Sequence, residues 1–306
     1  MLKKLRKLKS EEHGQALVFF VGIFAILLAV MAFVVDVGSV YVEKAKLQNA
    51  VDAAALAGAY DLTGGDDVIA ETIARGSANN YFDSNGYEDV IPIIDPEANS
   101  VKVSAIKNVN YTFAQIIGLS SANVKASATA SISPADGVTG VIPVGVVQQI
   151  FNIGQEYTLK EGGGDGANGN FGGLDFGSLT SFVNSSFKKG GAALFQDLVT
   201  EGYDQPIFVG EKVDTEPGAM SGKSFTENKI AFIPLVDSMD VEGKKELTIV
   251  GFAAFKVKNY YEEKTEIDGK TVKKGVIVGT FEYDVAASSV AGTYPDSGLR
   301  NVRLTE

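Results

Sequence analysis

A continuous apolar run near the N-terminus dominates the pattern of hydrophobic and polar positions along the chain. Residues 16–35 read ALVFFVGIFAILLAVMAFVV and carry no charged side chain. As a helix, a run of this length spans roughly 30 Å, the thickness of the hydrocarbon core of a bilayer. A lone strand would leave its backbone groups unpaired in hydrocarbon. We therefore predict one membrane-spanning helix, with a cleaved signal peptide and a buried core helix as the alternatives.

Two observations favour a retained span with a defined orientation. The run exceeds the roughly 7–15-residue apolar core of a signal peptide, and further helix follows it instead of a break. Residues 1–14 hold five basic and two acidic side chains, and Asp36 closes the span on the other side. The positive-inside rule then predicts a single-pass membrane protein with a cytoplasmic N-terminus and the bulk of the chain extracellular.

The helical pattern continues beyond Asp36. Apolar residues recur there at three- and four-residue steps opposite charged side chains, as expected for an amphipathic helix. We predict one helix from about Gln15 to Tyr60, roughly 70 Å long, which Gly64-Gly65 ends. The apolar positions above the membrane are Val37, Val40, Tyr41, Leu47, Val51, Ala54 and Ala55.

The next segment predicts a small α+β unit packed on the long helix. A second helix over residues 66–82 takes Asp66 or Asp67 as its N-cap, and Asn85-Gly86 forms a turn. Residues 101–113 and 123–132 alternate as strands do, and a short helix lies between them around residues 114–118. The expected apolar side of the second helix is Val68, Ile69, Ile73 and Phe82.

The chain changes character at Pro134-Ala135-Asp136-Gly137, the expected domain boundary. Beyond it, helix is limited to about 179–187 and 191–200, and Asp268-Gly269 between two β-rich arms is a two-residue hairpin signal. The β-rich runs are residues 140–147, 155–160, 229–236, 245–257 and 275–286. We predict a mostly antiparallel β domain, a sandwich or a barrel, and an α+β fold for the whole chain.

Composition narrows the function classes. The 306 residues carry a formal charge of −11, no cysteine and one histidine. These counts exclude disulfides, thiolate metal sites and multi-histidine metal sites. The acidic body repels nucleic acid, so we expect no nucleic-acid partner. His13 lies among charges ahead of the span, where contact with lipid headgroups explains it better than catalysis.

The glycine-rich loop 162–173 is the main candidate for chemistry. Gly164–Gly169 fits G-x-G-x-x-G, but the residues after it cannot open the helix that a dinucleotide site needs. A solvated turn is favoured over a calcium site here, because the spacing matches neither an EF-hand nor a G-G-x-G-x-D repeat. Gly222-Lys223-Ser224 lacks the glycine of a P-loop, since Pro217 takes its place. The oxygen ligands available for calcium are Asp165, Asn168, Asn170 and Asp175.

Paired carboxylates and aromatic clusters also have simple structural explanations. Asp66-Asp67 suits a helix cap, and Glu262-Glu263 lies on a charged hairpin arm, so neither predicts a glycosidase. Tyr260-Tyr261 and the pair Phe252 and Phe255 fit strand packing better than a sugar platform. The sequence therefore predicts no catalytic residue, no cofactor and no metal site.

Residues 13–60 carry a resemblance to a known family. The segments HGQALVFF and VVDVGSVYVEKAKLQNAVDAAALAGA resemble the N-terminal helix of TadG-like proteins of Tad (Flp-type) pilus systems. FAQIIGLSSANVKASATASI, residues 113–132, resembles the stretch that closes the membrane-proximal domain in that family. IPLVDSMD and IVGFAAFKV are similar, more weakly, to its C-terminal region. The resemblance implies a membrane-anchored, pilin-like protein made with a fibre-assembly apparatus, and no enzymatic activity.

One departure from pilin-like sequences concerns processing. Pseudopilins of these systems are cut after a glycine and carry a glutamate five residues on. A cut after Gly14 would make Gln15 the first residue and Phe19 the fifth, so the glutamate is missing. An uncleaved anchor is the simpler interpretation, and cleavage near Gly14 followed by polymerisation is the alternative.

The expected organisation combines these elements. Residues 1–14 form a basic cytoplasmic leader, 15–60 the transmembrane and pilin-like helix, 61–133 a membrane-proximal head and 138–306 an external β domain. We expect a non-enzymatic surface protein that serves pilus assembly or adhesion; a tethered calcium- or carbohydrate-binding module is a further alternative. Expected partners are membrane lipid and, through the helix, other pilus-assembly proteins or further copies of the chain. The residues predicted to pack in the span are Ala16, Gly22, Ala25, Ala29, Ala32 and Asp36.

Overall fold

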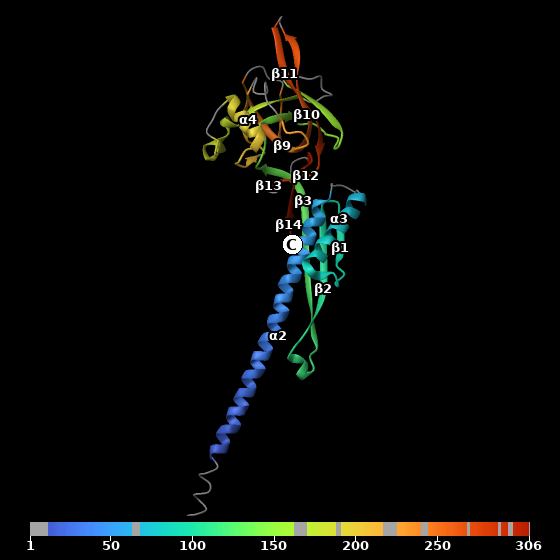
Figure 1. Ribbon diagram of the computed structural model, residues 1–306, viewed down its shortest axis with the longest axis vertical. Coiled ribbons are helices and arrows are strands. Elements are labelled where there is room, and N and C mark those ends of the chain that lie inside the picture. The colour runs from blue at the N-terminus through green and yellow to red at the C-terminus, as the bar shows by residue number, and fades with distance from the viewer. Residues whose placement is uncertain are drawn as a thin grey trace, which may run out of the picture. The chain divides into compact units, whose positions relative to one another are not determined.

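The computed structural model describes most of the chain (Figure 1). The described residues are 12–62, 68–161, 170–187, 191–216, 225–239, 244–267, 270–286, 289–292 and 296–305. They fall into two compact units. The first comprises residues up to 130, apart from 63–65, together with 304–306, and the second comprises 63–65 and 131–303. An N-terminal helix followed by a strand-rich part confirms the predicted α+β fold.

The first unit is built on one long helix. The helix α2, Glu12–Tyr60, matches the predicted continuous helix, and its C-terminal half packs on a second helix and a small sheet. The sheet has the order β1-β2-β3, with β1 and β2 antiparallel and Ile94 opposite Val103. The other elements of this unit are α3 (Val68–Phe82), η1 (Asp83–Tyr87), β1 (Ile93–Glu97), β2 (Ser100–Asn110), η2 (Ala114–Ile117) and the first part of β3 (Ser121–Val138).

Small side chains set the contact between α2 and α3. A Cβ added at Gly58 would lie 3.0 Å from the carbonyl oxygen of Ala74 and 3.1 Å from the Cβ of Ala78, so the helices meet at close range. The predicted apolar side of α3 is wrong for Val68, Ile69 and Ile73, which are exposed, and right for Phe82, which is fully buried. Alanines at four-residue spacing allow a closer approach than branched side chains do. The buried residues of α3 are Ala70, Ala74, Ala78 and Phe82.

The predicted apolar face of α2 is buried only toward the C-terminal end of the helix. Leu47, Val51, Ala54 and Ala55 are fully buried, but Val37 and Tyr41 are exposed, because the sheet and α3 cover the helix only toward its C-terminal end. The residues predicted to cap the second helix, Asp66 or Asp67, and the glycines expected to end α2 lie outside the described residues.

Two features of the sheet were not predicted. The strand β1 has a short apolar run that Pro96 interrupts; as an edge strand it tolerates the missing amide donor. The segment 134–137, where the chain was expected to change character, lies within β3, which continues past residue 130 into the second unit.

The second unit contains a closed ring of strands. Its order is β11-β5-β6-β4-β9-β10, and β10 pairs again with β11, while β8 (Lys212–Thr215) pairs with both β10 and β6. Most pairs are antiparallel, as predicted, but β4 pairs with β9 and β5 with β6 in parallel. The ring strands are β4 (Val144–Val147), β5 (Glu156–Glu161), β6 (Asn170–Asp175), β9 (Ile230–Val236), β10 (Glu246–Ile267) and β11 (Lys270–Glu282).

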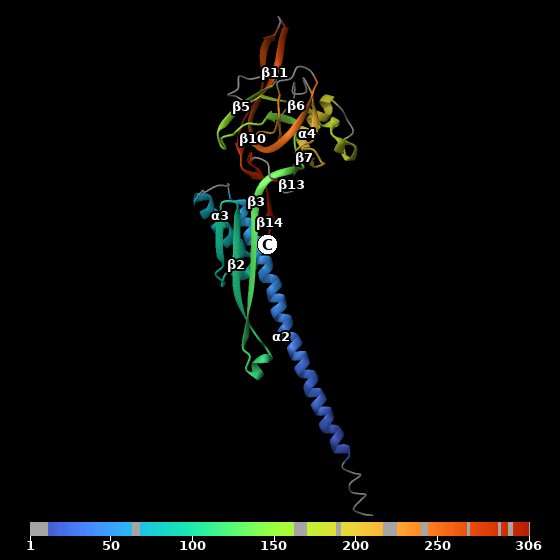
Figure 2. The same cartoon turned by 180° about the vertical axis from the view of Figure 1, so that it is seen from behind.

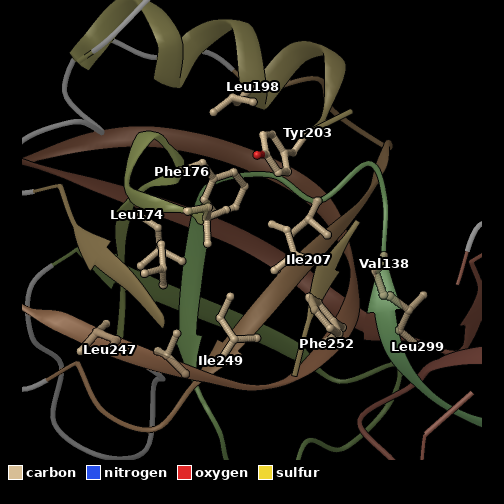
Figure 3. Close-up of a cluster of buried hydrophobic side chains, with 14 of the residues drawn as sticks. Val138, Leu174, Phe176, Leu198, Tyr203, Ile207, Leu247, Ile249, Phe252 and Leu299 are labelled. Atoms are coloured by element: carbon tan, nitrogen blue, oxygen red, sulfur yellow. The ribbon is translucent and has the colours of Figure 1, made fainter. Parts of the chain in front are cut away.

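Large apolar side chains and one helix fill the space beside the ring. In Figure 3, Leu198 of α4 (Gly191–Glu201) lies above Tyr203 and Phe176, which are fully buried. A Cβ added at Gly202, where φ is +80°, would lie 2.7 Å from the backbone carbonyl oxygen of Gly140. The backbone segments at Gly140 and Gly202 therefore lie in close contact. The α4 helix confirms the prediction for residues 191–200.

The hairpin prediction at residues 268–269 is confirmed by pairing. Ile267 lies opposite Lys270, so β10 and β11 are joined by two residues, which themselves lie outside the described part. The helix predicted over 179–187 is reduced to the short 3-10 helix η4 (Thr180–Asn184), and another 3-10 turn, η3 (Phe176–Ser178), precedes it. Short strands complete the unit: β7 (Ile207–Phe208), β12 (Asp284–Val285), β13 (Ser289–Ala291) and β14 (Leu299–Leu304).

Candidate functional site

The N-terminal half of α2 is an apolar surface with no protein cover. From Ala16 to Val35 the side chains are exposed, apart from the half-buried Ala32, and Phe19 and Met31 keep 70% and 64% of their surface accessible. Helix α2 is long and apolar enough to cross a membrane by length and composition. A soluble protein would hide such a surface in its core. Here nothing in the described part of the chain covers it.

The small residues predicted to pack in the span lie on this exposed surface. Around Gly22 an added Cβ would meet no atom within 4 Å, so the isolated chain leaves that position open. Ala16, Ala25 and Ala29 are exposed as well. Gly14 and Gln15, the expected cleavage position, lie in the first turn of α2, and the described side chains begin after them. The structure brings none of these residues together with another element.

Asp36 is different from the other residues predicted for the span, because it is 2% exposed. Its Oδ1 accepts hydrogen bonds from the backbone amides of Thr112 at 2.7 Å and Phe113 at 3.2 Å. Its Oδ2 accepts from Phe113 at 3.0 Å and from Ala114 at 2.6 Å. One carboxylate therefore satisfies the free amides at the start of η2 and ties the β2–β3 connection to α2.

The chemistry of this tie suits a carboxylate. Backbone amides at the start of a helical turn have no partner within the turn, and a negative charge there is favourable. Hydrogen bonds to an ionised acceptor are shorter and stronger than those between neutral groups. Sequence reasoning placed Asp36 as the residue that closes the span and grouped it with the residues predicted to pack there. The sequence feature that could have indicated this role is the position of Asp36, an acidic residue directly after the apolar run.

Polar side chains of α2 continue the attachment above Asp36. Gln48 Nε2 donates to the carbonyl oxygen of Ser127 at 2.8 Å, and Lys44 Nζ donates to that of Lys125. Figures 1 and 2 both show the β2–β3 hairpin running alongside α2. The helix and the hairpin are thus joined along their length by hydrogen bonds from the helix to the backbone of β3.

A tyrosine adds a titratable contact to the same unit. Tyr87 Oη donates to Glu43 Oε1 at 3.2 Å. Burial, together with the charge of Glu43, raises the pKa of Tyr87 to about 12. On the neighbouring turn, the hydrogen bond from Lys107 Nζ to Asp89 at 2.6 Å lowers the pKa of Asp89. The first contact ties η1 to α2 and the second ties β2 to the turn after η1, and neither has the geometry of a catalytic pair.

The remaining candidates form no site in the described part of the molecule. Asp175 bonds Lys244 at 2.7 Å and accepts from the amide of Gly177, and its proposed partners Asp165 and Asn168 lie outside the described residues. Gly222-Lys223-Ser224 also lies outside them. No group of His, Asp and Glu side chains suited to a metal ion occurs among the described residues.

The aromatic and acidic candidates of the hairpin arm have structural surroundings. Phe252 and Phe255 are buried, and the Tyr260 ring lies 5.0 Å from that of Phe225. Glu262 pairs with Lys273 across the strands at 2.8 Å. These contacts agree with the strand-packing interpretation, although Tyr261 remains 42% exposed.

The comparisons with known proteins point to the same helix. Residues 14–61 match the family described as putative Flp pilus-assembly TadE/G-like, which confirms the predicted resemblance. This family is structural rather than enzymatic, and its match together with the exposed apolar helix supports membrane anchoring. No curated protein and no solved structure matches the chain.

Proposed function

Taking the TadE/G-like match of residues 14–61 as the premise, we propose that this chain is a membrane-anchored, non-enzymatic component of a Tad/Flp-type pilus system. Residues 16–35 are its anchor, the N-terminus lies in the cytoplasm, and the second unit is presented outside for pilus assembly or adhesion. The observation that carries the proposal is the division of α2 into an uncovered apolar half and a packed half.

The physical argument concerns what can cover the exposed half. Twenty apolar residues in one helix bury a large area in lipid, at about 25 cal/mol per Å² of apolar surface removed from water. The exposed side chains point to all sides of the helix, as in a helix surrounded by hydrocarbon. A helix bundle of further copies is the other apolar environment, and it belongs to the polymerising alternative.

The N-terminus of the mature protein distinguishes the two forms. We expect intact-mass and N-terminal peptide spectrometry of the membrane fraction to find Met1 or a trimmed end ahead of the basic cluster. A chain that begins at Gln15 and is recovered from sheared surface fibres would contradict the anchor and support the pilin alternative. A freely soluble chain that begins beyond Asp36 would refute both.

A substitution at the cleavage position provides the matched control. Gly14→Leu removes the glycine that a leader peptidase requires and leaves the apolar run intact. For a permanent anchor, the variant and the parent chain show the same mass, membrane fraction and surface level. If cleavage is needed, the variant accumulates with its leader and fibres disappear.

A further inference from the structure

The connection between β2 and β3 carries an apolar surface that other described residues leave uncovered. Ile116 and Ile117 are 84% and 77% exposed, Leu119 is 55% exposed and Phe113 is 41% exposed. We call residues 111–119 the hairpin tip. Burial of an aliphatic side chain is favourable, so exposure of several of them together is costly in water.

Charge is absent over the whole region around the hairpin tip. From Asn108 to Val124 the sequence contains no acidic or basic residue, and Lys107 and Lys125 stand at its two ends. Charged side chains are costly in hydrocarbon, whereas lysines at its boundary extend toward the headgroups. Tyr111 and Phe113 add the aromatic residues that are common at membrane interfaces. The pattern is that of a segment that enters a lipid surface.

The hairpin tip is held at a defined level of α2. Asp36, the first residue after the apolar run, bonds the amides of Thr112 and Ala114 at 2.7 and 2.6 Å. In Figures 1 and 2 the hairpin extends along α2 and its turn lies toward the N-terminal half of the helix. Because twenty helical residues are needed for the hydrocarbon core, Asp36 and the tip share the outer boundary of the bilayer.

We propose that the hairpin tip inserts into the outer leaflet beside the span, as a second membrane contact of this chain. Ile116, Ile117 and Leu119 enter the upper acyl region, and Tyr111 and Phe113 lie among the headgroups. This rests on the proposed anchoring of residues 16–35. Two contacts joined through Asp36 restrict the tilt of α2, since the tilt of a spanning helix is set by its packing and by its anchors at the interface.

The absence of cysteine from the chain allows a direct test. Full-length variants I116C, L27C and I91C each carry one nitroxide spin label, in vesicles of phosphatidylcholine and phosphatidylglycerol. Relaxation by oxygen reports lipid, and relaxation by a water-soluble nickel chelate reports water. Ile91 is 93% exposed in the same unit, beside Lys44 and Gln48, which lie two to three helical turns beyond Asp36. It is the matched aqueous control.

The expected result is an oxygen-dominated signal at Ile116 and Leu27 and a nickel-dominated signal at Ile91. A lipid signal at Leu27 with a water signal at Ile116 would overturn the insertion of the hairpin tip and leave the anchor in place. A water signal at Leu27 would contradict the anchor itself. A label at Ile116 that is shielded from both reagents, with spin–spin broadening, would show a second copy on the tip and also overturn the proposal.

Discussion

The tie between Asp36 and the hairpin tip is the contact whose loss has the most defined consequence. In Asp36→Ala the amides of Thr112, Phe113 and Ala114 lose their acceptor. A hydrogen bond to a charged group contributes about 1.5–3 kcal/mol, but Thr112 and Phe113 are exposed enough for water to replace part of it. About 1 kcal/mol for each amide gives roughly 3 kcal/mol for the tie.

Amide hydrogen exchange of the full chain in nanodiscs measures this loss directly. Since about 1.4 kcal/mol corresponds to tenfold, the amides of residues 112–114 are expected to exchange roughly 100-fold faster in Asp36→Ala. Asp36→Asn retains one acceptor oxygen and no charge, so its effect is expected to be intermediate. Peptides covering α3 and the second unit remain unchanged.

Asp52→Asn is the matched control for this experiment. Asp52 is also an acidic residue of α2, but it accepts a hydrogen bond from Gln48 at 2.8 Å and does not contact the tip. Exchange at residues 112–114 is expected to stay as in the parent chain. Equal acceleration in both variants, or none in Asp36→Ala, would refute the role assigned to the carboxylate.

The remaining predictions concern packing and pH, each measured by urea unfolding of the full chain in detergent. Gly58→Leu is expected to cost about 1–3 kcal/mol, because its Cβ has no room at the α3 contact, whereas Gly76→Leu, in open space on α3, costs nothing; equal effects would contradict the close approach. The pKa of Tyr87, raised to about 12, means that the folded state favours the protonated phenol. Its stabilisation is therefore complete below pH 10, the ordinary pKa of a tyrosine, and is lost as the pH rises toward 12, so the stability of the parent chain relative to Tyr87→Phe should fall over that range. A difference that stays constant would argue against the raised pKa. Gly202→Ala combines a positive φ with a backbone clash and should cost about 3 kcal/mol or more, against about 1–2 kcal/mol for Gly210→Ala, where φ is positive but the space is open. Equal losses of stability in Gly202→Ala and Gly210→Ala would show that the backbone clash at Gly202 contributes nothing.

The two halves of α2 explain how one helix serves two environments. Its N-terminal half is apolar on every side. In its C-terminal half Leu47, Ala50 and Val51 are buried, and Lys44 and Gln48 donate hydrogen bonds to the hairpin backbone. Asp36 stands where these environments meet. A single residue therefore closes the apolar run and begins the packed unit, which makes it the point at which anchoring and folding are coupled.

Local features of the chain were sufficient for much of the architecture. The apolar run and the alanine-rich segment after it predict α2 to its last residue, because helix formation depends on neighbouring positions. Alternating residues predict β2, and β-rich runs predict β9 and the arms of the β10–β11 hairpin. A two-residue turn sets the register of Ile267 with Lys270. The uncovered span is likewise a property of the sequence alone.

Only the tertiary structure decided which surfaces meet. The alanines of α3, rather than its larger Val68 and Ile69, face α2, since the closest approach of two helices is set by both surfaces together. The pairing of β11 with β5 and the parallel pairing of β4 with β9 join strands that are distant in the chain. The bonds of Asp36 join residues separated by 76 to 78 positions, beyond the reach of any local pattern.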